Sequence, residues 1–135
     1  MNREFKEFKE FKALKAKEEF NYSEPDAGIL EYFENPGATE VSLVNKEFTS
    51  LCPITGQPDY SEITLTYEPG GKCVESKSLK LYYASYRNCG AFTEDLAQRI
   101  ASDLYAKLEC PLRVTVSSVS RGGIAIKATC TKGGW

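Results

Sequence analysis

Apolar and polar residues alternate in two segments of the first half of the chain. TEVSLVNKEF (residues 39–48) and SEITLTYEP (residues 61–69) place an apolar side chain at nearly every second position. A period of two puts successive side chains on opposite faces, which predicts two half-buried β-strands. Two prolines and a glycine between them, in SLCPITGQPD (residues 50–59), predict a loop.

The middle of the chain has the three- and four-residue spacing of amphipathic helices. ESKSLKLYYASYRN (residues 75–88) is predicted to form a helix of about three turns. FTEDLAQRIASDLYAKL (residues 92–108) carries an apolar residue at every fourth position. Acidic residues directly after Thr93 favour a helix start there, because carboxylates stabilise the positive end of the helix dipole.

Two further strands are predicted near the C-terminus. RVTVSSVS (residues 113–120) and GIAIKATC (residues 123–130) are joined through Arg121-Gly122-Gly123, which predicts a tight hairpin. The order is strand, strand, helix, helix, strand, strand. We therefore expect an α+β domain with an antiparallel four-stranded sheet and two helices on one face.

The length of 135 residues fits one domain. Residues 1–20 are predicted to be a charged N-terminal extension, and residues 21–135 a single domain whose first part, residues 21–37, is irregular connecting structure. No apolar run approaches the roughly 20 residues that cross a bilayer, and the N-terminus lacks an apolar signal-peptide core. We expect a cytoplasmic protein with no membrane contact.

Charge and histidine content exclude several classes of function. Seventeen Lys and Arg against nineteen Asp and Glu give a net charge of -2, which argues against a constitutive nucleic-acid binder. The chain has no histidine, so Ser-His-Asp triads, Cys-His dyads and HExxH zinc sites are excluded. Any general acid or base must be Asp, Glu, Lys, Tyr or Cys.

The cysteines do not predict a metal site or a disulfide framework. Their number is odd and no two form a CxxC pair, so a four-cysteine zinc site is not expected. In a cytoplasmic chain most of these thiols should be reduced and buried. The five are Cys52, Cys73, Cys89, Cys110 and Cys130.

The predicted loop at residues 50–59 is the first candidate for chemistry. Cys52 stands beside a proline in a polar turn, and Asp59 follows just before a strand. A thiolate is the best nucleophile in this chain, and a nearby carboxyl group can supply a proton to its adduct. From spacing alone, a half-buried loop cysteine and a turn-capping aspartate remain the commoner interpretation.

Other segments are weaker candidates for binding. Lys77 and Lys80, with Ser76 and Ser78, are placed to hold a phosphate, although a solvated helix start is the commoner interpretation. Glu94, at a helix entrance, is either a helix-dipole acid or a carboxylate that pairs with a guanine-like or pterin ring. Arg121 is most simply a hairpin residue, and it also suits an anion beside exposed backbone N–H groups.

Together these segments resemble a known family. FTSLCPITGQPD, VESKSLKLYYASYRN, FTED and SRGGIAI, in this order and spacing, closely resemble the short form of the 7-cyano-7-deazaguanine reductases, NADPH-dependent nitrile reductases of the queuosine pathway. The resemblance covers roughly residues 35–130. It implies the tunnelling fold, in which subunits assemble into rings and build active sites at their interfaces.

The resemblance also implies roles for individual residues. Cys52 corresponds to the nucleophile that adds to the nitrile carbon and forms a thioimide, and Asp59 to the proton donor. The substrate-binding positions that it implies are Val74, Glu75, Ser76, Thr93 and Glu94. The positions implied for binding NADPH are Ser76, Lys77, Arg121 and Gly122.

The resemblance further implies a homo-oligomer, in which Glu94 is expected to reach the site from a neighbouring subunit. The substrate is then 7-cyano-7-deazaguanine, with no direct contact to nucleic acid.

One position departs from the family pattern. The family usually has His immediately before the Glu that corresponds to Glu94, and this chain has Thr93. Thr can form hydrogen bonds but cannot carry a proton near neutral pH. A transferase or lyase acting on a 7-substituted deazaguanine is therefore a second hypothesis, and a non-catalytic purine- or pterin-binding ring protein is a third.

Overall fold

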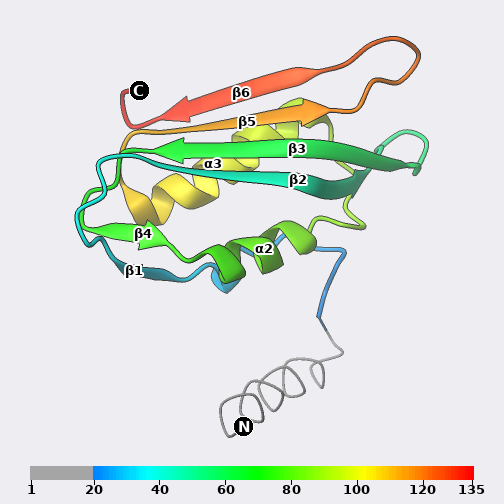
Figure 1. The fold of residues 1–135 in the computed structure, drawn as a ribbon. Coiled ribbons are helices and arrows are strands. Elements are labelled where there is room, and N and C mark those ends of the chain that lie inside the picture. The colour runs from blue at the N-terminus through cyan, green and yellow to red at the C-terminus, as the bar shows by residue number, and fades with distance from the viewer. Residues whose placement is uncertain (1–19) are drawn as a thin grey trace, which may run out of the picture.

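The computed structural model describes residues 20–135 (Figure 1). Most of the predicted N-terminal extension, residues 1–19, lies outside the described residues. The main sheet is antiparallel throughout, with the strand order β2-β3-β5-β6. Its strands are β2 (Val41–Leu51), β3 (Pro58–Tyr67), β5 (Leu112–Ser118) and β6 (Lys127–Lys132).

Two helices lie on the same side of this sheet, so the predicted α+β class is confirmed (Figure 1). The helices are α2 (Ser76–Ala84) and α3 (Thr93–Leu108). The four-residue spacing in α3 buries Leu96, Ile100, Leu104 and Leu108. They meet inward-facing strand residues, of which Ile63, Leu65, Leu112, Val114 and Val116 are fully buried. Burial of these apolar side chains is the main stabilising contribution to the fold.

The start of α3 also forms as expected. The carboxylate of Asp95 accepts a hydrogen bond of 3.2 Å from the N–H of Phe92, which is the residue before the helix. Glu94 and Asp95 place two negative charges in the first turn, where the helix dipole favours them. These interactions stabilise the first turn of α3 and fix where the helix begins.

The irregular structure predicted for residues 21–37 is partly wrong. This segment contains a short 3-10 helix, η1 (Ala27–Ile29), and a strand, β1 (Tyr32–Glu34). Strand β1 pairs antiparallel with β4 (Lys72–Val74) to make a second, two-stranded sheet. A three-residue strand is too short to show a two-residue period, so the pattern of the sequence could not reveal it.

Several predicted element ends also differ from the structure. Strands β2 and β3 extend to Leu51 and from Pro58, into the predicted loop at residues 50–59. Helix α2 ends at Ala84, because the next N–H groups, of Tyr86 and Arg87, bond to carbonyls only three residues back. Strand β6 begins at Lys127 and not at residue 123. The tight turn is present, with Gly122 and Gly123 at φ of 60° and 81°, but the adjoining Ile124 is 70 % exposed. No core lies beneath this hairpin tip to hold a regular ladder.

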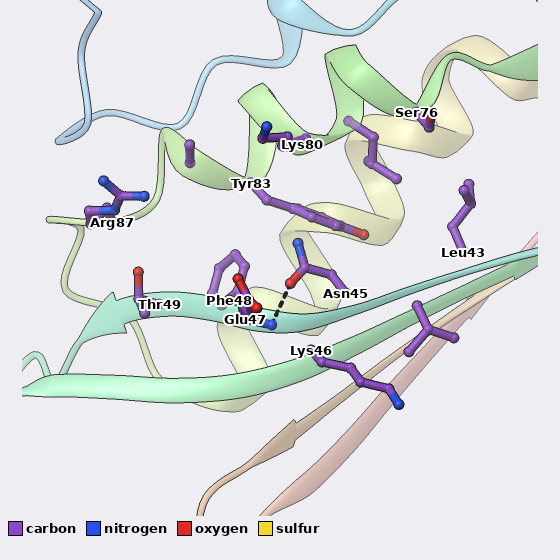
Figure 2. Close-up of a pocket in the computed structure, with 13 residues that line it drawn as sticks. Leu43, Asn45, Lys46, Glu47, Phe48, Thr49, Ser76, Lys80, Tyr83 and Arg87 are labelled. Carbon is purple, nitrogen blue, oxygen red and sulfur yellow. Dashed lines mark hydrogen bonds between the residues drawn. The ribbon is translucent and has the colours of Figure 1, made fainter.

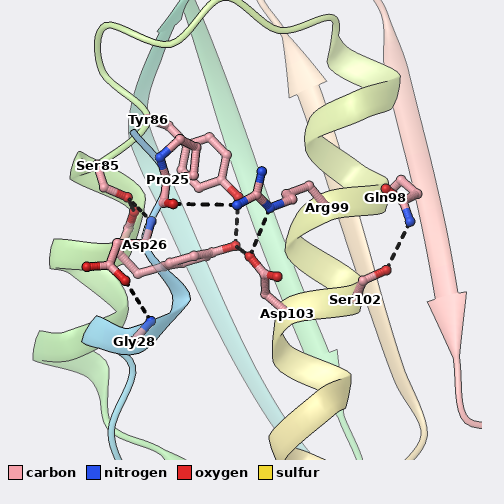
Figure 3. A network of polar contacts seen from close by, with 10 residues as sticks. Pro25, Asp26, Gly28, Ser85, Tyr86, Gln98, Arg99, Ser102 and Asp103 are labelled. Atoms are coloured by element: carbon pink, nitrogen blue, oxygen red, sulfur yellow. Dashed lines mark hydrogen bonds and ion pairs between the residues drawn. The ribbon is translucent and has the colours of Figure 1, made fainter. Parts of the chain in front are cut away.

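A buried polar network joins α2, α3 and the N-terminal segment (Figure 3). The hydroxyl of Tyr82 donates to the carboxylate of Asp103 at 2.6 Å and shares a 2.7 Å hydrogen bond with the hydroxyl of Tyr86. Arg99 pairs with the same carboxylate at 3.3 Å and also reaches the carbonyl oxygen of Pro25. Each buried hydroxyl here has a partner, and the network fixes α2 against α3.

Candidate active site

Cys52 is the first residue of the loop that joins β2 to β3. Its N–H donates to the carbonyl of Gln57 at 2.8 Å, and its own carbonyl accepts from the N–H of Gly56 at 2.9 Å. Gly56 has a φ of 73°, which side chains other than glycine adopt only with strain. These bonds close residues 52–57 into a compact turn with the thiol half-buried at its base.

This turn favours the thiolate form of Cys52. Hydrogen bonds from the Thr55 hydroxyl, and then from the N–H groups of Thr55 and Ile54, lower the pKa of the thiol below its ordinary value. Partial burial and the negative charge of Asp59 act in the opposite direction. Burial raises the pKa of another thiol, Cys110. A lowered pKa increases the fraction of Cys52 in the thiolate form, which is the nucleophilic form of a thiol.

Asp59 lies close to Cys52 and is held by the hairpin between β5 and β6. Arg121 donates to the Asp59 carboxylate and, with its other terminal nitrogen, to the side-chain oxygen of Gln57. Arg121 is 62 residues from Asp59 in the sequence, so only the fold brings them together. The structure therefore places Cys52, Asp59 and Arg121 in one cluster.

The segment before α3 lies against the same loop. Leu51 forms a parallel bridge with Gly90. The N–H of Leu51 donates to the carbonyl of Cys89 at 3.0 Å, and the N–H of Ala91 donates to the carbonyl of Leu51 at 3.1 Å. A Cβ atom at Gly90 would lie 3.3 Å from the Cα of Pro53, so the backbones approach closely there. Thr93 and Glu94 begin α3 only a few residues further along.

The structure thus connects Glu94 to the Cys52 end of its own chain. Glu94 is exposed and Thr93 is half-buried. This arrangement favours a site in which Glu94 and Cys52 come from one subunit, in contrast to the expectation that Glu94 arrives from a neighbour.

The other residues implied for substrate binding lie at the opposite end of the sheet. The N–H of Val74 donates to the hydroxyl of Tyr67 at 3.0 Å, and Tyr67 is the last residue of β3. Cys52 lies beyond the first residue of β3, Pro58. At 3.3 Å per residue, the nine steps from Pro58 to Tyr67 span about 30 Å. One chain therefore does not bring Val74 and Glu75 to Cys52.

Glu75 caps the helix that follows it. Its two carboxylate oxygens accept from the N–H groups of Lys77 at 2.8 Å and Ser78 at 2.7 Å, which lowers the pKa of Glu75. Ser78, which the sequence suggested as a phosphate contact, is buried, and its hydroxyl donates to the Glu75 carbonyl at 2.7 Å. The Glu75 carboxylate thus occupies the free N–H groups of Lys77 and Ser78 at the N-terminus of α2. The side chains of Ser76 and Lys77 are exposed.

A cavity of about 510 Å³ lies between α2 and β2 (Figure 2). One face of α2 forms its upper wall with Ser76, Lys80 and Tyr83, and Arg87 extends this wall beyond the end of the helix. Strand β2 forms the opposite wall. Its lining residues there are Leu43, Val44, Asn45, Lys46, Glu47, Phe48 and Thr49.

Tyr83 gives this cavity an unusual polar feature. The side chain is 4 % exposed, and its hydroxyl is buried with no hydrogen-bond partner. A buried hydroxyl without a partner costs about 1–3 kcal/mol. Figure 2 shows Tyr83 reaching across the space between α2 and β2 towards Asn45, whose side-chain oxygen accepts from the N–H of Glu47 at 2.8 Å.

Several residues of this cavity were not identified from the sequence. Tyr83 belongs to the predicted helix at residues 75–88, and Asn45 to a predicted strand whose alternation indicates only the face on which a residue lies. The regular interval from Ser76 through Lys80 to Arg87 was the available signal. Among residues 20–135 no group of three or more potential metal ligands occurs, and no helix is long and apolar enough to cross a membrane.

Comparison with known proteins gives consistent results. The family described as QueF-like protein matches residues 58–134. The NADPH-dependent 7-cyano-7-deazaguanine reductase of Helicobacter pylori (strain J99) is 52% identical over 108 residues, covering 77% of this chain and 73% of the relative. The protein of the same name from Chlorobium chlorochromatii is 46% identical over 101 residues, covering 71% of this chain and 86% of the relative.

A solved structure is also similar. The crystal structure of the archaeosine synthase QueF-Like in the apo form has a TM-score of 0.68 and 26% sequence identity. The match covers 73% of this chain and 98% of that one.

Proposed function

The chain belongs to the family of NADPH-dependent 7-cyano-7-deazaguanine reductases, and we propose that it performs the family's reaction with Cys52 as nucleophile, at a site completed by a second copy of the chain. It is an oxidoreductase that reduces the nitrile of 7-cyano-7-deazaguanine in queuosine biosynthesis, with NADPH as cofactor. The assignment of Cys52 is carried by one observation: it lies in a turn that stabilises a thiolate.

Reduction of a nitrile to a primary amine takes four electrons. NADPH supplies these as two hydrides, and two protons complete the balance. The Cys52 thiol passes its proton to the Asp59 carboxylate and the resulting thiolate adds to the nitrile carbon. One C–N π bond becomes a lone pair on nitrogen, and Asp59 gives the proton to that nitrogen. The resulting thioimide carbon is planar, so a hydride can approach it, and the covalent bond retains the half-reduced species.

Arg121 and Gln57 position Asp59 for this role. Their contacts hold the Asp59 carboxyl group beside the Cys52 turn, where a substrate nitrile nitrogen would lie. A general acid has to lie within hydrogen-bond reach of the atom that it protonates. The resemblance to the family also implies that Arg121 and Gly122 bind NADPH.

Substrate recognition is proposed to involve two subunits. Thr93 and Glu94 would grip the deazaguanine from the chain that supplies Cys52, and Val74, Glu75 and Ser76 would come from its neighbour. Glu75 retains unused lone pairs on its carboxylate, because each oxygen accepts one backbone N–H.

Exposed apolar side chains support a homo-oligomer with interface sites, because such patches often mark contacts between proteins. Near the Cys52 end, the exposed large apolar residues include Ile54, Tyr60, Phe92, Val119 and Ile124.

We also propose a cytoplasmic location. All five cysteines are free thiols, as is usual in a reducing compartment. A transferase or lyase activity is not favoured, since relatives at 46% and 52% identity are reductases. The archaeosine synthase with a similar fold is only 26% identical.

NADPH oxidation with 7-cyano-7-deazaguanine tests the proposal. We expect two NADPH consumed per substrate, and a thioimide adduct on Cys52 detected by mass spectrometry. Cys52→Ala should show neither, whereas Cys130→Ala, which removes a half-buried thiol from β6, should retain both. An active Cys52→Ala enzyme would refute the role of Cys52.

A further inference from the structure

We infer that the hydroxyl of Ser50 is a positioning group for Asp59, which it holds by a hydrogen bond when Arg121 turns from Asp59 to the cofactor. This inference rests on the proposed function, because it concerns the proton transfer of that reaction and takes Arg121 as a residue that binds NADPH. Neither the sequence patterns nor the resemblance to the family assigns a role to Ser50.

Ser50 has a buried polar group without a partner at the end of β2 nearest Cys52. Its side chain is 1 % exposed, and its hydroxyl oxygen forms no hydrogen bond within residues 20–135. Two other buried hydroxyls in this part of the chain lack a partner, those of Tyr32 and Tyr83, and they belong to β1 and α2. Burial of an unbonded hydroxyl has a free-energy cost, so packing of the fold does not account for Ser50.

The strand register places Ser50 directly opposite Asp59. Strands β2 and β3 pair antiparallel with Ser50 against Asp59, and the hydrogen bond from the N–H of Cys52 to the carbonyl of Gln57 continues the ladder. Residues opposite each other in an antiparallel ladder point to the same face, with Cβ atoms about 4.5–5.5 Å apart. A hydroxyl and a carboxylate on such neighbouring Cβ atoms can form a hydrogen bond after rotation of their side chains.

The side chains of Ser50 and Asp59 point to the side of the sheet that carries the helices. Phe48 and Ser61 pair two positions further along the same ladder, and both are buried. The Phe48 ring packs edge-on against Tyr83 of α2, with ring centroids 5.7 Å apart. Alternation along each strand puts Ser50 and Asp59 on this side too. The Ser50 hydroxyl is therefore available to Asp59 without competition from solvent.

Asp59 has a free position for this hydrogen bond. One of its carboxylate oxygens accepts from Arg121, whereas no donor to the second oxygen is found within residues 20–135. An ionised carboxylate can accept several hydrogen bonds. The Arg121 side chain is 44 % exposed, so it can turn from Asp59 towards a bound cofactor without disturbing the core.

This exchange of partners suits the chemistry. Asp59 takes up the proton of the Cys52 thiol and gives it to the nitrile nitrogen, whereas the Ser50 hydroxyl keeps its own proton throughout. A guanidinium opposes protonation of a neighbouring carboxylate more strongly than a neutral hydroxyl does. With Arg121 on the cofactor, Ser50 thus keeps the carboxyl group in place and leaves it able to take up the proton.

Turnover with NADPH and thioimide formation without it test the exchange. In Ser50→Ala, kcat should fall about 10-fold, a part of the 10²–10⁴ that a general acid contributes, with KM for 7-cyano-7-deazaguanine unchanged. Without cofactor, Arg121 still holds Asp59, so thioimide formation should stay close to the wild-type rate. Ser50→Thr, which keeps a hydroxyl, should restore most of the lost kcat.

Two variant backgrounds show whether Ser50 acts through Asp59. In Arg121→Gln, Asp59 loses its arginine, so adding Ser50→Ala should slow thioimide formation about 10-fold even without cofactor, as for loss of a hydrogen bond to a charged group. In Asp59→Asn, adding Ser50→Ala should have no further effect, because the proton donor that it positions is gone. Mass spectrometry of the intact protein over time measures the adduct in each case.

Ser85→Ala is the matched control for loss of a buried serine hydroxyl. The Ser85 hydroxyl is fully buried, but it donates to the carbonyl of Tyr82 and accepts from the N–H of Asp26. Ser85→Ala should therefore lower the melting temperature and leave thioimide formation unchanged. Ser50→Ala should do the reverse: the melting temperature should stay the same or rise, because the hydroxyl that it removes has no partner in the fold.

The outcomes distinguish this inference from the proposed function. A further loss on adding Ser50→Ala to Asp59→Asn would show that Ser50 does not act through Asp59. An unchanged rate on adding it to Arg121→Gln would show that Ser50 does not replace Arg121. Either result overturns the inference while Cys52 still forms its adduct, so the proposed function stands. Absence of any adduct in the wild type would instead reject the role of Cys52.

Discussion

The two ends of the β2–β3 ladder differ in both chemistry and burial. At one end, the turn at residues 52–57 holds a thiol with a lowered pKa beside Asp59 and Arg121, among exposed apolar side chains. At the other end, Val74 is buried against the hydroxyl of Tyr67, and Glu75 caps α2. The residues proposed to react therefore lie at one end, and the segment proposed to bind substrate lies at the other.

This separation is the basis for the proposal that the site needs two chains. A ladder of about 30 Å lies between the two sets of residues, and a packed sheet does not bend to close such a distance. If both sets act on one small substrate, they must come from different copies of the chain. The predictions below test which residues belong to which end, from the largest expected effect to the smallest.

The largest effect is expected at the reactive end. Cys52→Ala should reduce turnover by about 10⁴-fold or more, because the covalent step is lost. Turnover and mass spectrometry of the intact protein with substrate measure this directly. Cys89→Ala removes a thiol in the segment that pairs with Leu51, and this variant should remain active. A correctly folded but inactive Cys89→Ala variant would show that the reaction needs the Cys89 thiol as well as that of Cys52.

Removal of the acid should have the next largest effect. Asp59→Asn keeps the size of the side chain and its contact with Arg121 but removes the transferable proton. Turnover should fall by about 10²–10⁴-fold, the usual contribution of a general acid. The rate of thioimide formation should fall in parallel, because that step needs a proton on nitrogen. Normal adduct formation in Asp59→Asn would assign the proton to another group.

The reactive cluster could be only partly predicted from the sequence. Cys52 and Asp59 are seven residues apart, and the prolines and glycine between them indicate a loop that can fold back. The ion pair of Asp59 with Arg121 joins residues 62 positions apart, so no local pattern reveals it. The separation of Glu75 from Cys52 also depends on the strand register, which pattern analysis does not give.

Glu94 is expected to bind substrate from the reactive end. Glu94→Gln should raise KM for 7-cyano-7-deazaguanine about 10- to 100-fold by removing a charge-assisted hydrogen bond, with a smaller change in kcat. Steady-state kinetics measures the split. Gln98→Glu, which alters charge one turn further along the exposed face of α3, should leave KM unchanged. An unchanged KM in Glu94→Gln would remove Glu94 from the site.

A smaller effect is expected from Thr55, which donates to the Cys52 sulfur. Thiolate is present above the pKa of the thiol, so a lowered pKa lets Cys52 react with iodoacetamide at lower pH. Thr55→Val should raise this pKa, move the midpoint of the alkylation profile to higher pH and slow alkylation near pH 7 by about 2- to 10-fold. A midpoint unchanged between wild type and Thr55→Val would contradict this account of the turn.

The fold was predictable where patterns are long. The four-residue spacing of α3 and the alternation of β2 and β3 persist over several repeats. In these elements the residues that the pattern places on one face are the ones that the fold buries, so local pattern and tertiary packing favour the same structure. Strands β1 and β4 have three residues each and exist because they pair with each other. Residues 123–126 were predicted as the start of the last strand, but Ile124 and Ile126 are exposed and cover no core, so β6 begins only at Lys127.

Mixing two inactive variants tests most directly whether the site is divided between chains. Cys52→Ala and Glu75→Gln are each expected to be nearly inactive, and the Gln retains an oxygen to cap α2. If the chains are unfolded together and refolded as mixed oligomers, random assembly gives about one site in four with both native residues. We predict recovery of about a quarter of wild-type activity. No recovery from mixed oligomers, with both variants correctly folded, would show that Cys52 and Glu75 act within one chain or not in one site.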